Sequence, residues 1–133
     1  MNKISGIIKE SGGGSYMTKN QEFFRRINTA FMTGDVDTIF ANISENIVWN
    51  MVGSNALIGK DAVIKEMEPM RGLEIAHHTK QIITHGKMAV IEGTMTMGEE
   101  GAYKKYAFCD IYKLDKHKDG KIIEITAYLI EVE

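Results

Sequence analysis

The end of the sequence contains two long segments of strand-forming residues joined by a short charged turn. The first, residues 102–114, is rich in aromatic and branched side chains, and the second runs from Lys121 to Val132. Between them, residues 115–120 are charged and end in Asp-Gly, a dipeptide typical of hairpin turns. This pattern predicts an antiparallel hairpin that is buried on at least one face.

The preceding residues divide into helices followed by strands. Thr18 and Gln21 fit a capping box, and apolar residues then recur at helical spacing as far as Gly34. Asp35 can cap a second short helix, and residues 59–69 predict a third. Strands are expected at residues 45–52, 73–85, 87–98, 102–114 and 121–132. Long strands joined by hairpins after three helices indicate an α+β fold with a strongly bent, mostly antiparallel sheet.

Length and composition indicate one globular domain. The chain has 133 residues, of which 17–133 form the expected domain, while residues 1–16, with a Gly-Ser-rich stretch, are expected to be a flexible N-terminal extension or linker. A net charge of -2 gives no basic surface for nucleic acid or an anionic membrane. The single cysteine, Cys109, rules out an intrachain disulfide and a cysteine-based zinc site. We expect a cytoplasmic protein without a metal site.

Asp110 is the first candidate for a functional residue because it is an acid within a strand of apolar residues. Alternation places it on the same face as Phe108 and Tyr112. A buried acid must be paired, kept neutral by desolvation, or used in chemistry. A purely structural carboxylate, satisfied by a lysine or a tyrosine hydroxyl, is the alternative.

A histidine pair is the second candidate. His77 and His78 are neighbours on an expected strand, so one faces inward and the other outward. An inward histidine could act as a general acid or base, or could simply hydrogen-bond to the backbone in the core. We take His78 as the expected second catalytic group beside Asp110.

Three local patterns together resemble one family. They are the helix-Gly-Asp-helix joint of residues 31–39, the strand residues Val48-Trp49 with the helix start at 59–63, and the turn at 119–122 followed by Ala127-Tyr128. This order resembles the nuclear transport factor 2-like superfamily, in particular its SnoaL-like and ketosteroid-isomerase-like branches. The resemblance implies a cone-shaped fold, in which a curved sheet wraps around three N-terminal helices and encloses a mostly apolar pocket. It also implies a homodimer that forms through the sheet.

The resemblance assigns a role to Asp110. Its position matches the protonated aspartic acid with which ketosteroid isomerase donates a hydrogen bond to an oxyanion. Met51 and Ile27 stand where that isomerase has a base and a tyrosine, so steroid-type isomerisation is not expected. Ala127 stands where limonene-epoxide hydrolase, another member, has an arginine, so that mechanism is also disfavoured.

The implied pocket is lined by residues from the helices and strands. The expected ligand-binding residues are Ile27, Phe31, Trp49, Met51, Phe108, Tyr112, Ile125, Ala127 and Leu129. Trp49 could stack on a flat ligand or could only fill the core. Two functions are open: a cofactor-independent cyclase-, isomerase- or hydrolase-type enzyme that acts on a small apolar molecule through Asp110, or a non-catalytic domain that binds a ligand or a protein partner.

Overall fold

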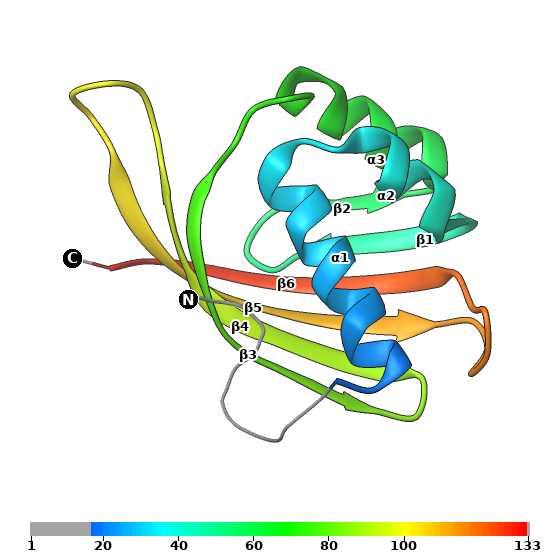
Figure 1. Ribbon diagram of the computed structural model, residues 1–133. Coiled ribbons are helices and arrows are strands. Elements are labelled where there is room, and N and C mark those ends of the chain that lie inside the picture. Colours follow the sequence, from blue (N-terminus) through cyan, green and yellow to red (C-terminus); the bar gives the residue numbers. More distant parts are fainter. Residues whose placement is uncertain (1–16, 133) are drawn as a thin grey trace.

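The computed structural model describes residues 17–132 as a group of helices packed on one curved sheet (Figure 1). The helices are α1 (Lys19–Thr33), α2 (Val36–Asn42) and α3 (Lys60–Met67), and a 3-10 turn, η1 (Glu68–Met70), follows α3. The expected extension at residues 1–16 lies outside the described residues. Within them, no helix is long and apolar enough to cross a membrane.

The predicted helix caps are confirmed. The Thr18 hydroxyl accepts a hydrogen bond from the Gln21 backbone N–H at 3.1 Å, and the Gln21 side chain accepts one from the Thr18 N–H at 2.9 Å. Gly34 ends α1 with a left-handed φ of 67°, and Asp35 caps α2 through the Thr38 N–H. These local interactions set where α1 and α2 begin and turn.

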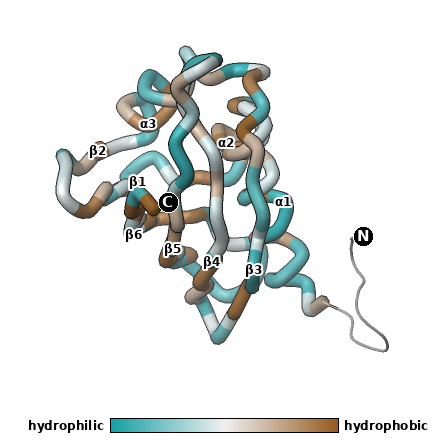
Figure 2. Tube along the Cα trace, turned by 90° about the vertical axis from the view of Figure 1, so that its left-hand side faces the viewer, coloured by the Kyte–Doolittle hydropathy of each residue, from teal (hydrophilic) through white to brown (hydrophobic). Residues whose placement is uncertain are grey.

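The sheet has six strands in the order β2-β1-β6-β5-β4-β3. Their bounds are β1 (Ile43–Met51), β2 (Ala56–Ile58), β3 (Ala76–His85), β4 (Met88–Met97), β5 (Lys104–Leu114) and β6 (Ile122–Val132). All neighbouring strands are antiparallel except β1 and β6, which are parallel. The predicted α+β class with a mostly antiparallel sheet is therefore confirmed, and the short edge strand β2 is an addition. Seen from the end at which β6 terminates, β2 and β3 lie on opposite sides (Figure 2).

The three helices lie on one face of the sheet, and the sheet curves around them (Figure 1). The hydrophobic core fills the space between these layers. Its fully buried side chains include Phe24, Ile27, Ile39, Ile43, Ile47, Val63, Ile91, Tyr112, Leu114, Ile122 and Ile125. Phe24 of α1 packs against Tyr112 of β5 with ring centroids 5.2 Å apart, which ties the first helix to the middle of the sheet.

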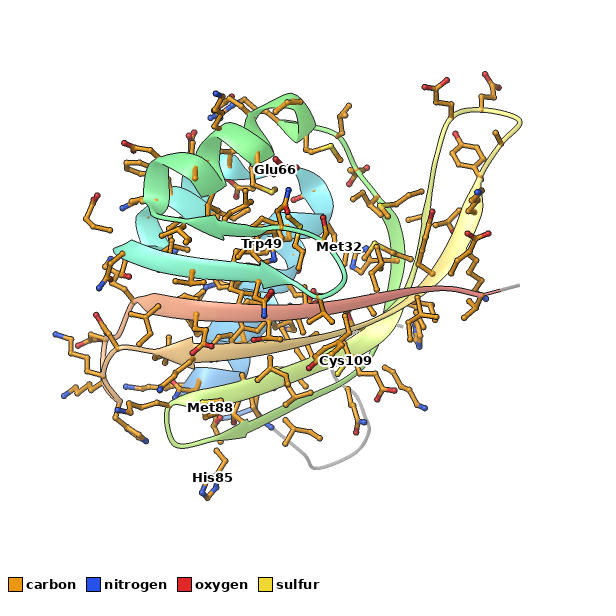
Figure 3. The ribbon with its side chains drawn as sticks, turned by 180° about the vertical axis from the view of Figure 1, so that it is seen from behind. Met32, Trp49, Glu66, His85, Met88 and Cys109 are labelled. Carbon is orange, nitrogen blue, oxygen red and sulfur yellow. The ribbon has the colours of Figure 1, made fainter. Side chains whose placement is uncertain are left out.

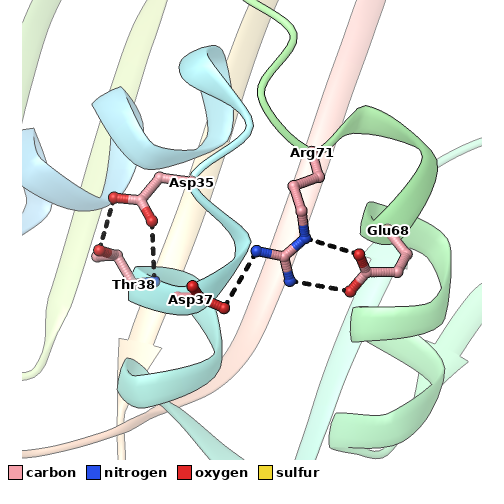
Figure 4. A network of polar contacts seen from close by, with 5 residues as sticks. All are labelled: Asp35, Asp37, Thr38, Glu68 and Arg71. Atoms are coloured by element: carbon pink, nitrogen blue, oxygen red, sulfur yellow. Dashed lines mark hydrogen bonds and ion pairs between the residues drawn. The ribbon is translucent and has the colours of Figure 1, made fainter.

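The segment between α3 and β3 is anchored to the α1–α2 joint. Arg71 makes a bidentate ion pair with Glu68 at 2.7 and 3.0 Å and reaches Asp37 of α2 at 3.2 Å (Figure 4). The backbone N–H of Gly72 donates to the Gly34 carbonyl at 3.0 Å. Because the ion pairs are exposed, the close backbone approach contributes more to this junction than the charges do.

Candidate functional site

Strand register brings Asp110 into the middle of the helix-facing side of the sheet. Asp110 lies opposite Ile91 on β4 and Ala127 on β6, and Ala127 in turn lies opposite Met51 on β1. Residues that face each other across neighbouring strands project to the same side. We call this side of the sheet the inner wall.

Most of the expected ligand-binding residues share the inner wall. From the strands these are Trp49, Met51, Phe108, Tyr112, Ile125, Ala127 and Leu129. From α1, Ile27 is buried in the core, and Phe31 meets Trp49 with ring centroids 5.3 Å apart. Leu129 is 45% exposed and therefore lies where the helices no longer cover the wall. The structure brings these residues together, and their contact with a ligand stays a prediction.

A glycine shapes the wall beside Asp110. Gly93 of β4 lies opposite Phe108, and a side chain there would come within 2.8 Å of the Phe108 ring. The absence of a Cβ lets the ring lie over β4, where it is buried. Phe108 thus fills the space next to Asp110 with apolar surface.

Asp110 is largely buried, and this raises the pKa of its carboxyl from 3.8 to about 7. Desolvation is the sole cause of this shift, so no hydrogen bond or charged group within residues 17–132 stabilises the carboxylate. The charge of Asp110 also adds to the burial that raises the pKa of Tyr112. These features favour a neutral carboxylic acid over a structurally paired carboxylate.

The structure corrects the expected partner of Asp110. His78 lies opposite Thr94, on the outer side of the sheet, and His77 lies opposite Met95, on the inner wall. The reason is an irregularity between Thr79 and Gln81, which shifts the alternation of β3 by one residue. Both histidines are exposed, and the His77 ring nitrogen lies 3.0 Å from the Ile75 carbonyl oxygen. His78 therefore does not accompany Asp110 within this chain.

Trp49 contributes a hydrogen-bond donor to the inner wall. Its indole Nε1 is buried and has no acceptor among the described residues. Phe31 meets the indole edge-on, with 65° between the ring planes. Buried polar groups normally have partners, so this N–H is an exception that needs an explanation.

One polar contact between a helix and the sheet was not predicted. Asn28 of α1 is 3% exposed, and its side-chain amide donates to the Thr79 hydroxyl at 2.9 Å. The signal was present in the sequence, because Asn28 lies in the same helical stripe as Phe24 and Phe31, at spacings of four and three residues. This contact fixes α1 on β3 near the irregularity in that strand.

The outer side of the sheet carries different groups. Cys109 lies opposite Glu92 and Tyr128, and burial raises the pKa of its thiol. Glu92 accepts a hydrogen bond from Gln81 at 2.6 Å. In the described part of the chain, no group of three histidine, cysteine or acidic side chains is arranged to hold a metal ion.

An open groove of about 920 Å³ lies near the N-terminal end of α1. It is lined by the start of α1 together with the β3–β4 and β5–β6 turns, including Lys19, Arg26, Gly86 and Lys118. None of the expected site residues lines it. The groove and the inner wall are thus separate features.

Comparisons with known proteins agree with this architecture. The family model described as a SnoaL-like domain matches residues 24–125. A solved NTF2-like protein of unknown function from Cytophaga hutchinsonii is 26% identical, with a TM-score of 0.69 over 83% of this chain and 98% of that one. A search among proteins of curated function found no match.

Two further solved structures share the fold at 18% identity. One is an LEH-like epoxide hydrolase from M. tuberculosis, with a TM-score of 0.66 over 79% of this chain and 80% of that one. The other comes from the de novo design of proteins with diverse pocket structures, with a TM-score of 0.66 over 84% of this chain and 99% of that one. With the family model matching most of the described residues, the chain belongs to the SnoaL-like domain family and has an NTF2-like fold.

Proposed function

We propose that the protein binds a small apolar molecule against the inner wall and acts on it through Asp110 as a neutral hydrogen-bond donor or general acid. The observation that carries this proposal is the state of Asp110. It is largely buried among apolar neighbours, its pKa is raised to about 7, and no group of the described chain pairs with it. Such an acid can donate a hydrogen bond to a developing oxyanion without a counter-ion.

The neighbours of Asp110 restrict the reaction class. Met51, which lies on the same row of the inner wall, cannot accept a proton as a carboxylate would. A reaction that needs only acid assistance fits this wall better than one that begins with proton abstraction. Cyclisation, isomerisation, dehydration and hydrolysis can each proceed in this way without a cofactor. The NTF2-like fold includes isomerases and epoxide hydrolases, in keeping with these classes.

A non-catalytic binding domain is the second candidate, and one observation favours it. Besides the exposed His77, the inner wall presents the Asp110 carboxyl, the Tyr112 hydroxyl and the Trp49 N–H, and each of these three can donate a hydrogen bond. A wall of donors can hold an oxygen-bearing ligand without changing it. The two candidates therefore share the binding surface and differ in turnover.

A charge-matched pair of variants distinguishes these functions. The first step is to identify the small molecules that copurify with the protein from its native host by mass spectrometry, and to assay their conversion. Asp110→Asn should lower turnover by about 10²- to 10⁴-fold, because general acid assistance is lost. Glu92→Gln makes the same change on the outer side of the sheet and should leave turnover unaltered.

The two candidate functions predict different results in these assays. Full activity in Asp110→Asn would refute general acid catalysis by this residue, because an amide donates a hydrogen bond but does not transfer a proton. Tight binding without turnover in the wild-type protein would establish the binding domain instead.

A further inference from the structure

The buried indole N–H of Trp49 has no hydrogen-bond acceptor within residues 17–132. Among these residues, no other buried side-chain nitrogen or oxygen lacks a hydrogen-bond partner. An unpaired buried donor destabilises the folded state, because the group loses its hydrogen bond to water. Folded proteins seldom keep such a group without a use for it.

The indole is held in a defined orientation. Trp49 lies in β1 between Leu57 of β2 and Ile125 of β6, so its side chain projects from the inner wall. Figure 3 shows Trp49 on the helix side of β1. The edge-on contact with Phe31 at 5.3 Å restricts rotation of the ring. The direction of the N–H is therefore set by packing before any ligand arrives.

Trp49 and Asp110 lie at different places on the same wall. Trp49 shares a row with Ile125 and Tyr112, whereas Asp110 lies on the next row, with Ala127. Asp110 is thus two strands across and two residues along from Trp49, which corresponds to roughly 12 Å between the two Cα atoms in a flat sheet. The inward curve of the sheet brings the two side chains toward each other.

We propose that the Trp49 Nε1–H is a specificity-determining donor, which receives an acceptor oxygen of the ligand at a point separate from Asp110. The ligand class is then an apolar ring compound with a carbonyl or ether oxygen at its Trp49 end. This inference rests on the proposed function of the inner wall. A donor that is buried and rigid rejects an analogue that lacks the acceptor, because the N–H would stay unpaired.

The Trp49 indole N–H can be observed without overlap, because Trp49 is the single tryptophan of the chain. A ¹⁵N–¹H spectrum of the full chain therefore contains one indole cross-peak. The probes are 1-indanone and indane, which share a ring system and differ in the carbonyl. We expect 1-indanone to move the indole proton downfield and to bind on the order of 10-fold more tightly than indane, which should leave the proton in place.

Trp49→Phe removes the donor and keeps an aromatic ring. In this variant the preference for 1-indanone should disappear while the affinity for indane is retained. The chemical shift of the wild-type indole needs no variant, so the test holds even if Trp49→Phe folds poorly.

The outcomes separate this inference from the proposed function. A preference for 1-indanone that survives in Trp49→Phe and is lost in Asp110→Leu, which removes every donor at that position, would overturn the role of Trp49 if the indole proton also stays unmoved, and it would leave the proposed function standing. If neither probe binds the wild-type protein, the result would count against the role of Trp49 and against the proposed function.

Discussion

Asp110 lies in the sheet between Ile91 of β4 and Ala127 of β6, two apolar residues from neighbouring strands. Its place in an apolar strand, on the face of Phe108 and Tyr112, follows from alternation along residues 106–114. Its raised pKa depends on Ile91 and Ala127, which come from other strands and remove water from the carboxyl. A single chemical group thus has its position fixed locally and its charge state fixed by tertiary structure.

Asp110 should make stability depend on pH. The folded chain keeps the Asp110 proton up to about pH 7, whereas the unfolded chain loses it near 3.8. The burial of Asp110 therefore does not lower the free energy of unfolding below about pH 4. It lowers this free energy progressively as pH rises toward 7, and by a constant amount above that. Asp110→Asn removes this titration, so it should gain at most about 4 kcal/mol over the wild type at about pH 8 and nothing at about pH 4.

Urea unfolding of both proteins across this range measures the difference. Glu92→Gln makes the corresponding change on the outer side of the sheet and serves as the control. A difference between Asp110→Asn and the wild type that does not change with pH would contradict a desolvated acid.

The faces occupied by His77 and His78 depend on strand pairing as well as on the local sequence. The sequence shows that adjacent strand residues face opposite ways, but it does not show the irregularity between Thr79 and Gln81. That irregularity depends on pairing with β4, where Gly93 approaches the His78 carbonyl closely. Alternation alone therefore could not predict that His77 faces the inner wall and His78 the outer side.

At the level of elements, features set by neighbouring residues were predicted well. The capping box of α1, Gly34 at its end and the Asp35 cap each use contacts within a few residues, and all three are confirmed. The long strands lie within a few residues of their expected positions. The strand β2 was not predicted, because three residues carry little pattern and pair only once β1 is in place.

The α1–α2 joint should be sensitive to any side chain at Gly34. A Cβ there would overlap the Met70 carbonyl oxygen and lie 2.6 Å from the Gly72 nitrogen, in addition to the left-handed φ of 67°. We expect Gly34→Ala to reduce the free energy of unfolding by about 3 kcal/mol.

Gly86 provides a matched control. It also has a left-handed φ, of 59°, but a Cβ there would have no neighbour within 4 Å. Gly86→Ala should cost about 1 kcal/mol for the backbone conformation alone. Equal losses of stability in the two variants, measured by urea unfolding, would show that the close approach at Gly34 is unimportant.

At the scale of the whole molecule, the side of the sheet away from the helices is the expected contact between two copies. It carries exposed apolar side chains, among them Ile83, Tyr128 and Ile130, and Ile130 is 64% exposed. We expect a homodimer through this surface, because burying such side chains is favourable.

Light scattering at micromolar concentration should give a mass near twice that of one chain. Ile130→Lys should shift the mass to that of a monomer, whereas Leu73→Lys, which replaces an exposed aliphatic side chain in the segment between α3 and β3, should not. A wild-type monomer at micromolar concentration would contradict the expected dimer.

The parallel pairing of β1 with β6 has a consequence for biosynthesis. Since β6 lies between β1 and β5, the sheet consists of two unconnected parts until the last of its strands has left the ribosome. Asp110 and Trp49 belong to different parts and come to share one wall only when β6 is inserted. The nascent domain must therefore remain competent to fold until β6 has been translated, with apolar strand faces open to chaperones until that strand arrives.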